Sequence, residues 1–381
     1  MVKVIQAAAF KQKRLSAASL GQSLGESSNG LQRGVHRLSQ LLLSRSVRAA
    51  IVTVGAACLA HRFFNWDQHS SWSVLVIDVE EKHQQQVAYV LNNALLPELG
   101  IEVQVALDAG LQQDQFDLCR TTNQLNQIAS QVNKPLVINF SIGSAGIDLM
   151  QIYLQRATHQ LERQYGRDRT AWSDEVTTQY QQFIKRAAEF SYSQIINQLY
   201  SQCDSGDIAQ HSFYQALNQL VQQGVNVVFA VGNGGKLLSD LRQLDYIPKK
   251  MVEDLTRSVF FSEPESLPAG VLVVGGAIQT MVGAYGANPF SMPSWAVDLV
   301  ALDQQVQVDA AGALESGTSF AAPKVSALLA NLRVLNPSLS PGDAEQLIKQ
   351  TAQTIDNVPV SKVGAGVMQV DRAMQRAHLN E

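Results

Sequence analysis

The sequence predicts an α/β fold, built on a doubly wound and mostly parallel sheet that is flanked by helices. From residue 72 onward, short continuous apolar runs alternate with stretches of helical periodicity. Continuous apolar runs of this kind are typical of strands buried on both faces. Strands that alternate with helices usually pair in parallel. With 46% hydrophobic residues in 381, the chain can bury such a sheet.

The expected elements follow one another in a regular order. Strands are expected at 73–77, 101–107, 136–140, 225–230 and 271–274. Helices are expected at 84–96, 121–131, 212–223, 325–330 and 343–351. Because ligands of such sheets bind at the carboxyl ends of the strands, the side chains that directly follow each strand are the first candidates for a site.

Residues 146–211 interrupt this alternation. Apolar residues recur there at helical spacing in two stretches, one from Ile147 to Leu161 and one from Val176 to Phe190. The polar stretch 166–169 separates them. We therefore expect an inserted helical hairpin that is carried by the main domain.

The first 70 residues differ in composition from the rest, so residues 1–70 and 71–381 are treated as separate regions. Residues 1–48 hold eight Lys and Arg residues against one acid, Glu26. The apolar run 49–60 rises about 18 Å as a helix, short of the roughly 30 Å hydrocarbon core of a membrane. The Arg- and Ser-rich, acid-poor composition resembles an organelle transit sequence. A membrane-surface helix and a solvated extension stay open, and with them the compartment.

The charge of the chain limits its classes of partner, and its cysteine content limits the covalent links and metal sites that the sequence predicts. The net charge of −4 argues against a nucleic-acid partner, because phosphate binding needs a concentrated basic surface. Cys58, Cys119 and Cys203 are widely spaced, show no metal-ligand pattern and define no disulfide framework. We expect them to be small buried or surface thiols.

The segment from Glu315 to Pro323 carries the clearest chemical signature. It reads Glu-Ser-Gly-Thr-Ser-Phe-Ala-Ala-Pro and runs into an apolar helix, which places Ser319 in the first helical turn. Backbone N–H groups there have no internal partner and favour negative charge, such as that of an attacking alkoxide or an oxyanion. Gly317 allows a close approach of the chain, and Pro323 is tolerated early in a helix. Taken alone, such a serine is more often a helix cap.

The pattern Gly-Thr-Ser-x-Ala-x-Pro resembles the nucleophile motif of the subtilisin family, and it is carried here by Gly317, Thr318, Ser319, Ala321 and Pro323. The resemblance extends from about residue 72 to 376, and the segment 364–371 resembles the closing strand of the family. It implies a subtilisin-like, seven-stranded-type parallel sheet. It also implies a serine endopeptidase that hydrolyses peptide bonds through an acyl-enzyme, with Ser319 as nucleophile.

The same resemblance assigns further residues, each at the end of an expected strand. Asp78 would accept a hydrogen bond from the catalytic imidazole. Asn233, in a Gly-Asn motif, would donate its side-chain amide to the oxyanion together with the Ser319 N–H. The Ser-x-Gly motif borders the substrate cleft, where the backbone pairs with an extended substrate. It is formed by Ser141, Ile142 and Gly143.

The histidine is where the chain departs from the family pattern. Family members place His-Gly-x-His-Val-Ala well after the Asp, and this chain has no His-Gly pair. His83 is the candidate, because Val87 and Ala88 follow it at the matching spacing. Only residues 79–82 separate it from Asp78, which is a common length for a strand-to-helix connection. We expect Asp78 and His83 to face each other across this short turn.

Several alternatives stay open at this point. A related family uses a Glu-Asp pair with an acidic oxyanion residue; Glu80 and Glu81 are compatible with it, whereas His83 and Asn233 speak against it. The chain could also be an inactive relative that binds an extended peptide without cutting it. A third alternative is a membrane-bound or partner-docking protein that acts through residues 1–70 and the helical insertion.

The family resemblance also bears on partners and cofactors. It implies a protein or peptide substrate and no organic cofactor or catalytic metal. Structural calcium is common in the family, and the sequence shows no clear ligand loop for it.

Overall fold

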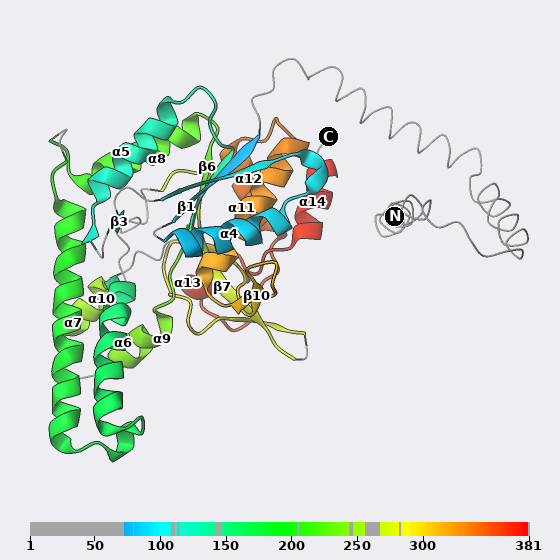
Figure 1. Cartoon of the computed structure of the whole chain (residues 1–381). Helices are drawn as coiled ribbons and strands as arrows, with labels where there is room; N and C mark the ends of the chain where they lie inside the picture. Colours follow the sequence, from blue (N-terminus) through cyan, green and yellow to red (C-terminus); the bar gives the residue numbers. More distant parts are fainter. Residues whose placement is uncertain are drawn as a thin grey trace, which may run out of the picture. The chain divides into compact units, whose positions relative to one another are not determined.

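A seven-stranded, mostly parallel sheet forms the centre of the compact unit Ser70–Glu381 (Figure 1). Five parallel strands lie in the order β2-β1-β5-β6-β7, and β9 pairs in parallel with the other edge of β7. β8 pairs antiparallel with the end of β7. The strands are β1 (Ser73–Asp78), β2 (Glu102–Leu107), β5 (Val137–Phe140), β6 (Asn226–Ala230), β7 (Val271–Gln279), β8 (Tyr285–Ala287) and β9 (Val297–Leu302). The predicted fold class is confirmed.

The computed structural model describes residues 72–381 except 79, 108–110, 113–114, 142–145, 204–205, 244–246, 256–266, 282 and 380–381. These residues belong to one compact unit, Ser70–Glu381. The expectations for residues 1–70, including the transit or membrane segment and Cys58, lie outside the described residues, and so do Ile142 and Gly143. None of the helices in the described part of the chain combines the length and apolar character that a membrane crossing requires.

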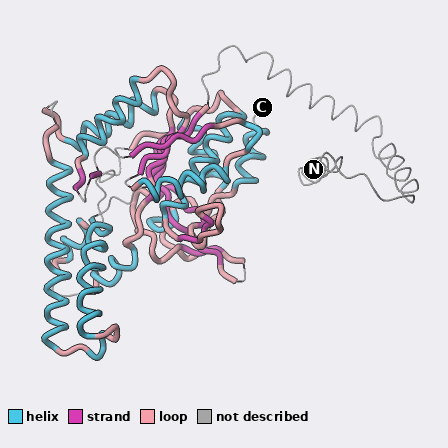
Figure 2. The backbone as a smooth tube through the Cα atoms, in the orientation of Figure 1, coloured by secondary structure: helices cyan, strands magenta, loops and turns pink. Residues whose placement is uncertain are grey.

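Helices cover both faces of the sheet (Figure 2). One layer consists of α4 (Glu81–Ala94), α11 (Thr318–Leu335), α12 (Pro341–Thr351) and α14 (Val370–Leu379). The opposite layer contains α5 (Leu118–Ser130) and α8 (Ala209–Gln222). The shorter elements are η2 (Pro97–Leu99), β3 (Leu111–Gln112), β4 (Gln115–Phe116), α9 (Gly235–Leu241), α10 (Lys249–Asp254), β10 (Val306–Gln307), β11 (Leu314–Glu315) and α13 (Val360–Val363).

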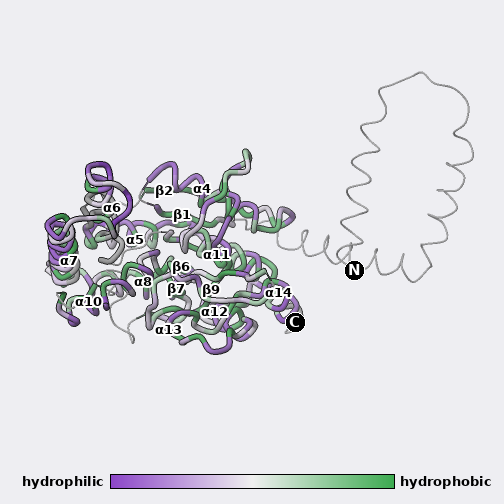
Figure 3. The backbone as a smooth tube through the Cα atoms, turned by 90° about the horizontal axis from the view of Figure 1, so that it is seen from below, coloured by the Kyte–Doolittle hydropathy of each residue, from purple (hydrophilic) through white to green (hydrophobic). Residues whose placement is uncertain are grey.

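Strand β1 shows how the two layers arise from the sequence. Successive side chains of a strand point to opposite faces. Val74 and Val76 pack in the cluster that contains α4 and α11, while Leu75 and Ile77 pack in the cluster that contains α5 and α8. All six residues of β1 are buried, as expected for a continuous apolar run. Figure 3 shows hydrophobic colour along the strands and more hydrophilic colour at the periphery.

The insertion forms the expected helical hairpin. It consists of α6 (Gly146–Tyr165) and α7 (Asp174–Tyr200), joined through η3 (Arg169–Ala171), and the two helices lie side by side in Figure 1. At the turn, the Trp172 indole N–H donates to Gly166 O at 3.0 Å, and the Ser173 side chain caps α7. Met150 of α6 and Ile184 of α7 belong to the same apolar cluster as α5 and α8.

The expectation of free thiols is wrong for two cysteines. Cys119, in the first turn of α5, and Cys203, between α7 and α8, form a disulfide with an S–S distance of 2.01 Å and a Cα–Cα distance of 5.4 Å. They are separated by 84 positions in the chain. The fold brings them together because α5 and α8 are neighbours in the same helical layer, which the spacing of the cysteines does not reveal.

The expected closing strand near residues 364–371 is reduced to single bridges. Val367 pairs in parallel with Val300 and antiparallel with Gln353. Gly366, at φ 119°, approaches the backbone of Gln353 so closely that a Cβ would overlap with it. The segment therefore adds one isolated pairing to the edge of β9 and one to Gln353, and it forms no strand of its own.

Candidate active site

The sheet changes its winding direction between β1 and β5. From β1 the chain crosses to β2 on one side, and it then returns to β5 on the other side. The carboxyl ends of two such strands form the usual ligand crevice of doubly wound sheets. Asp78 ends β1, and Ser141 directly follows β5. Two of the residues expected from the sequence therefore lie at this crevice.

Asp78, His83 and Ser319 lie in one hydrogen-bonded line. His83 Nδ1 is 2.7 Å from Asp78 Oδ2, and His83 Nε2 is 3.0 Å from Ser319 Oγ. Asp78 is fully buried, and the His83 side chain is 28% exposed. Both distances are in the range of good hydrogen bonds. The short connection after β1, with Glu80 as N-cap of α4, places His83 in the first turn of that helix.

The surroundings of His83 set its protonation. Burial lowers the pKa of the imidazole, but the hydrogen bond to Asp78 and the charges of Asp78, Glu80 and Glu315 outweigh it, so the net pKa is raised above 6.5. Because the Asp78 carboxylate accepts from Nδ1–H, the neutral ring presents the Nε2 lone pair to Ser319. The Phe320 ring lies beside the imidazole at 5.5 Å between centroids.

Gly317 shapes the space in front of Ser319. Its backbone has φ 151° and ψ 157°, in a region that is essentially restricted to glycine. A Cβ on Gly317 would lie 3.3 Å from both Asn233 Oδ1 and Nδ2 and 3.5 Å from Ser319 Oγ. The absence of a side chain thus keeps open the space between the Asn233 amide and the Ser319 hydroxyl.

Asn233 is oriented by the residue that precedes Ser319. Its Oδ1 accepts from Thr318 N at 2.9 Å and from Thr318 Oγ1 at 3.2 Å. Thr318 Oγ1 in turn accepts from Gly232 N at 3.1 Å. These bonds turn the carbonyl branch of the amide toward the start of α11. The Nδ2 group forms the other branch of the same amide. Thr318 had no assigned role in the sequence, although it is part of the motif.

The side chain of Ser141, to which the sequence assigned no role apart from that of its backbone, faces the protein interior. Its side chain is buried, and Oγ donates to Ser319 O at 2.9 Å. The same hydroxyl accepts from Asn139 Nδ2 at 2.7 Å, and Asn139 Oδ1 accepts from Ser326 Oγ at 2.9 Å. No periodicity or motif pointed to Asn139 or Ser326. The one available signal was that each is a single polar residue inside an apolar segment.

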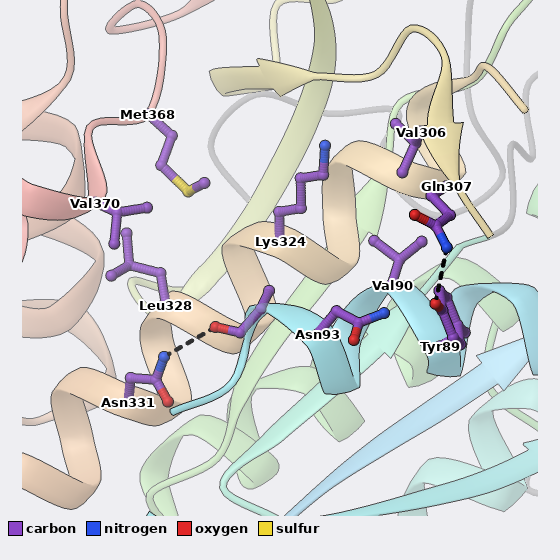
Figure 4. Close-up of a pocket in the computed structure, with 11 residues that line it drawn as sticks. Tyr89, Val90, Asn93, Val306, Gln307, Lys324, Leu328, Asn331, Met368 and Val370 are labelled. Carbon is purple, nitrogen blue, oxygen red and sulfur yellow. Dashed lines mark hydrogen bonds between the residues drawn. The ribbon is translucent and has the colours of Figure 1, made fainter. Parts of the chain in front are cut away.

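Within the described residues, these side chains belong to no metal-ligand cluster, and the pocket drawn in Figure 4 lies elsewhere. Within the described ranges, no group of three or more His, Cys, Asp or Glu side chains could hold a metal ion. A pocket of about 420 Å³ lies between α4, α11, β10 and the segment around Met368 (Figure 4). Tyr89 and Gln307 are hydrogen-bonded at its rim, and Lys324 contributes to its wall. Asp78, His83, Asn233 and Ser319 do not line it.

The fold and these contacts define an α/β protein with a serine-centred site at the carboxyl edge of a parallel sheet. The model of the subtilase family matches residues 102–366, which is more than half of the chain, and the chain therefore belongs to the subtilase family. The match includes Ser141, Asn233 and Ser319. It begins after Asp78 and His83, where the chain departs from the usual family spacing.

Three solved structures illustrate what the chain is similar to. The epidermin leader peptide processing serine protease of Staphylococcus aureus is 15% identical, with 81% of this chain and 77% of that chain covered and a TM-score of 0.45. The self-cleaved protease domain of PatA is 15% identical, with 81% and 96% covered and a TM-score of 0.46. Fervidolysin from Fervidobacterium pennivorans, a keratinolytic enzyme related to subtilisin, is 15% identical, with 80% and 42% covered and a TM-score of 0.42. No curated protein matches the chain in sequence.

Proposed function

We propose that this chain is a serine endopeptidase that uses Asp78, His83 and Ser319 as a catalytic triad. The observation that carries the proposal is the continuous line from Asp78 Oδ2 through the His83 ring to Ser319 Oγ, with heavy-atom distances of 2.7 and 3.0 Å. A hydroxyl, an imidazole and a buried carboxylate in this order are the parts of an activated nucleophile. Membership of the subtilase family supports the same reading.

The reaction follows from the positions of the three groups. Ser319 Oγ attacks the carbonyl carbon of the scissile peptide bond, and His83 Nε2 takes the hydroxyl proton. Asp78 holds the ring orientation and stabilises the imidazolium that forms. When the C–N bond breaks, the imidazolium gives its proton to the leaving amine, and an acyl-enzyme ester remains. Water then attacks the ester with His83 again as base, which releases the carboxylic acid and restores Ser319.

Two donors would stabilise the oxyanion. The Ser319 N–H lies in the first turn of α11, where the helix end favours negative charge. The second donor would be Asn233 Nδ2, because Thr318 holds the carbonyl branch of this amide and the amide borders the same space at Gly317 as Ser319 Oγ. Preorganised donors of this type stabilise the tetrahedral intermediate without further reorganisation.

The proposed substrate is a protein or peptide bound in extended form. The end of β5 offers the place for it, because the backbone of Ser141, Ile142 and Gly143 would pair with the substrate as an added strand. Ser141 lies directly after β5, while Ile142 and Gly143 are outside the described residues.

Residues 1–70 would add membrane or organelle targeting. Fractionation of the full chain against residues 71–381 tests this.

Labelling with a fluorophosphonate probe tests the proposal. The full chain should be labelled and should cleave casein, and Ser319→Ala should lose both activities. Ser361→Ala is the matched control, because Ser361 is an exposed serine on α13 and its removal should change neither. Labelling that survives Ser319→Ala would refute the assignment. A folded wild-type chain without labelling or cleavage would instead support the peptide-binding, inactive alternative.

A further inference from the structure

The second turn of α11 contains a proline that changes the hydrogen bonding of the nucleophile. In an α-helix the carbonyl of residue i accepts from the N–H of residue i+4. For Ser319 this donor would come from position 323, which is Pro323 inside α11. Proline has no N–H, and its ring crowds the carbonyl of the residue four positions earlier. The Ser319 carbonyl therefore cannot receive its regular helical hydrogen bond.

Ser141 supplies a donor to this carbonyl from the neighbouring strand. Its Oγ lies 2.9 Å from Ser319 O. A hydroxyl has one proton to donate, and the direction is fixed here because Asn139 Nδ2 donates to the same oxygen at 2.7 Å. The Ser141 proton is thus directed at Ser319 O. Only 3% of Ser141 is exposed, so water does not compete easily for this bond.

The same network holds α11 at a second point. Ser326 Oγ is 2.9 Å from Asn139 Oδ1 and 3.1 Å from Ala322 O of its own helix, so Asn139 offers the shorter of two acceptor contacts, and both Asn139 and Ser326 are fully buried. Ser319 and Ser326 are about two helical turns apart and thus lie on the same side of α11. Asn139 of β5 and Ser141 directly after it therefore contact α11 at two levels of its axis. This fixes both the rotation and the axial position of the first turns of α11.

The location of β5 explains why this matters for the proposed reaction. β5 is the parallel neighbour of β1, with Phe140 paired to Ile77. The residues that follow these two are Ser141 and Asp78. The anchor of the nucleophile and the acid of the proposed triad therefore stand on adjacent strand ends.

We propose that Ser141, supported by Asn139 and Ser326, is a positioning residue that sets the place of the Ser319 hydroxyl relative to His83. The inference rests on the proposed function. Ser141 touches neither the imidazole nor the reacting atoms; it acts through the Ser319 carbonyl. The hydroxyl that replaces the missing helical donor thereby holds the nucleophile at 3.0 Å from His83 Nε2.

Ser141→Ala tests this role, with kinetics and probe labelling as readouts. The expected result is a fall in kcat and in the fluorophosphonate labelling rate by roughly 10- to 100-fold, because small misplacements of a reacting group cost about this much. KM should change by less than about threefold, since the backbone is retained. The midpoint of the pH profile should stay in place, because His83 keeps its partner Asp78. Ser141→Thr, which restores a hydroxyl, should recover most of the labelling rate.

Thr351→Val is the matched control for a purely structural effect. Thr351 is also buried, and its Oγ1 donates to a helix carbonyl, Leu347 O, at 2.8 Å in α12. Its removal should lower the unfolding temperature to a similar extent and leave the labelling rate unchanged. If Ser141→Ala does not fold, Ser326→Ala removes the other end of the network and should slow labelling to a smaller extent.

The outcomes separate the two proposals. If the wild type is labelled and folded Ser141→Ala and Ser326→Ala are labelled at the same rate, the positioning role is refuted and the triad stands. If the folded wild type is not labelled, both proposals fall. Non-additive effects of Ser141→Ala and Ser326→Ala on the labelling rate would support a shared network through Asn139.

Discussion

At the scale of single residues, the charges around His83 determine the pH range of the proposed base. Burial alone would lower the pKa of the ring, and three carboxylates, from Asp78, Glu80 and Glu315, raise it above its ordinary value. Two of them, Glu80 and Glu315, are exposed and come from different elements, the N-cap of α4 and β11. A base must be neutral to accept a proton. We therefore expect the acidic limb of kcat/KM to have its midpoint above pH 6.5.

Glu315→Gln should move this limb to lower pH. The change removes one negative charge that favours the imidazolium, so the pKa of His83 falls and the neutral base persists to lower pH. The plateau at alkaline pH should keep its height. The measurement is kcat/KM between pH 5 and 9 at low salt, where the charge is least screened. Glu98→Gln, an exposed acid beyond the far end of α4, is the control and should leave the profile unchanged.

At the scale of elements, the sequence predicted the strands and helices that local apolar patterns define. Apolar runs located the strands around Asp78, Ser141 and Asn233, and helical periodicity located the insertion. α4 was expected from residue 84 and starts at Glu81, because its first turn is polar and adds nothing to the periodicity. The links between distant segments were not predictable from spacing: the Cys119–Cys203 disulfide and the bonds of Asn139 to Ser141 and Ser326. They depend on which elements become neighbours in the fold.

The disulfide should stabilise the layer that carries the insertion. It closes a loop across 84 positions, and the chain-entropy model assigns about 4–5 kcal/mol to a loop of this size, with about 2–4 kcal/mol typically measured. We expect the double variant Cys119→Ser, Cys203→Ser to lose about 2–4 kcal/mol of unfolding free energy in urea titrations without reductant. With reductant, the wild type should match the variant. Recovery of Cys119 and Cys203 as free thiols by alkylation and mass spectrometry would contradict the pairing.

At the scale of the whole molecule, the fold buries several charged groups between its layers. Lys349 lies 2.7 Å from Asp298 and 3.0 Å from Glu345, which compensates the two acids. Asp303 is fully buried and is held by Asn288, whose Nδ2 donates to both carboxylate oxygens at 2.8 and 2.9 Å. Its backbone also accepts from Gly317 N at 2.9 Å. Asp303, whose carboxylate is held by an amide, is therefore joined through its backbone to Gly317, two residues before the nucleophile Ser319.

Asp303 should make the stability of the folded protein fall between about pH 4 and 6. Burial raises its pKa from 3.8 to about 6, although Asn288 and Lys324 act in the opposite direction. In this window the folded chain holds the proton and the unfolded chain has lost it, so the unfolding free energy decreases as pH rises. The full shift corresponds to about 3 kcal/mol. Asp303→Asn removes this titration. The unfolding free energy of wild type minus that of the variant should therefore drop by up to about 3 kcal/mol between pH 4 and 7, measured by urea unfolding at each pH.

Asp371→Asn, at an exposed position on α14, is the control for the Asp303 prediction and should show no comparable drop. If the difference for Asp303→Asn is flat across this pH range, the Asp303 carboxylate is already ionised at pH 4 and the prediction is wrong.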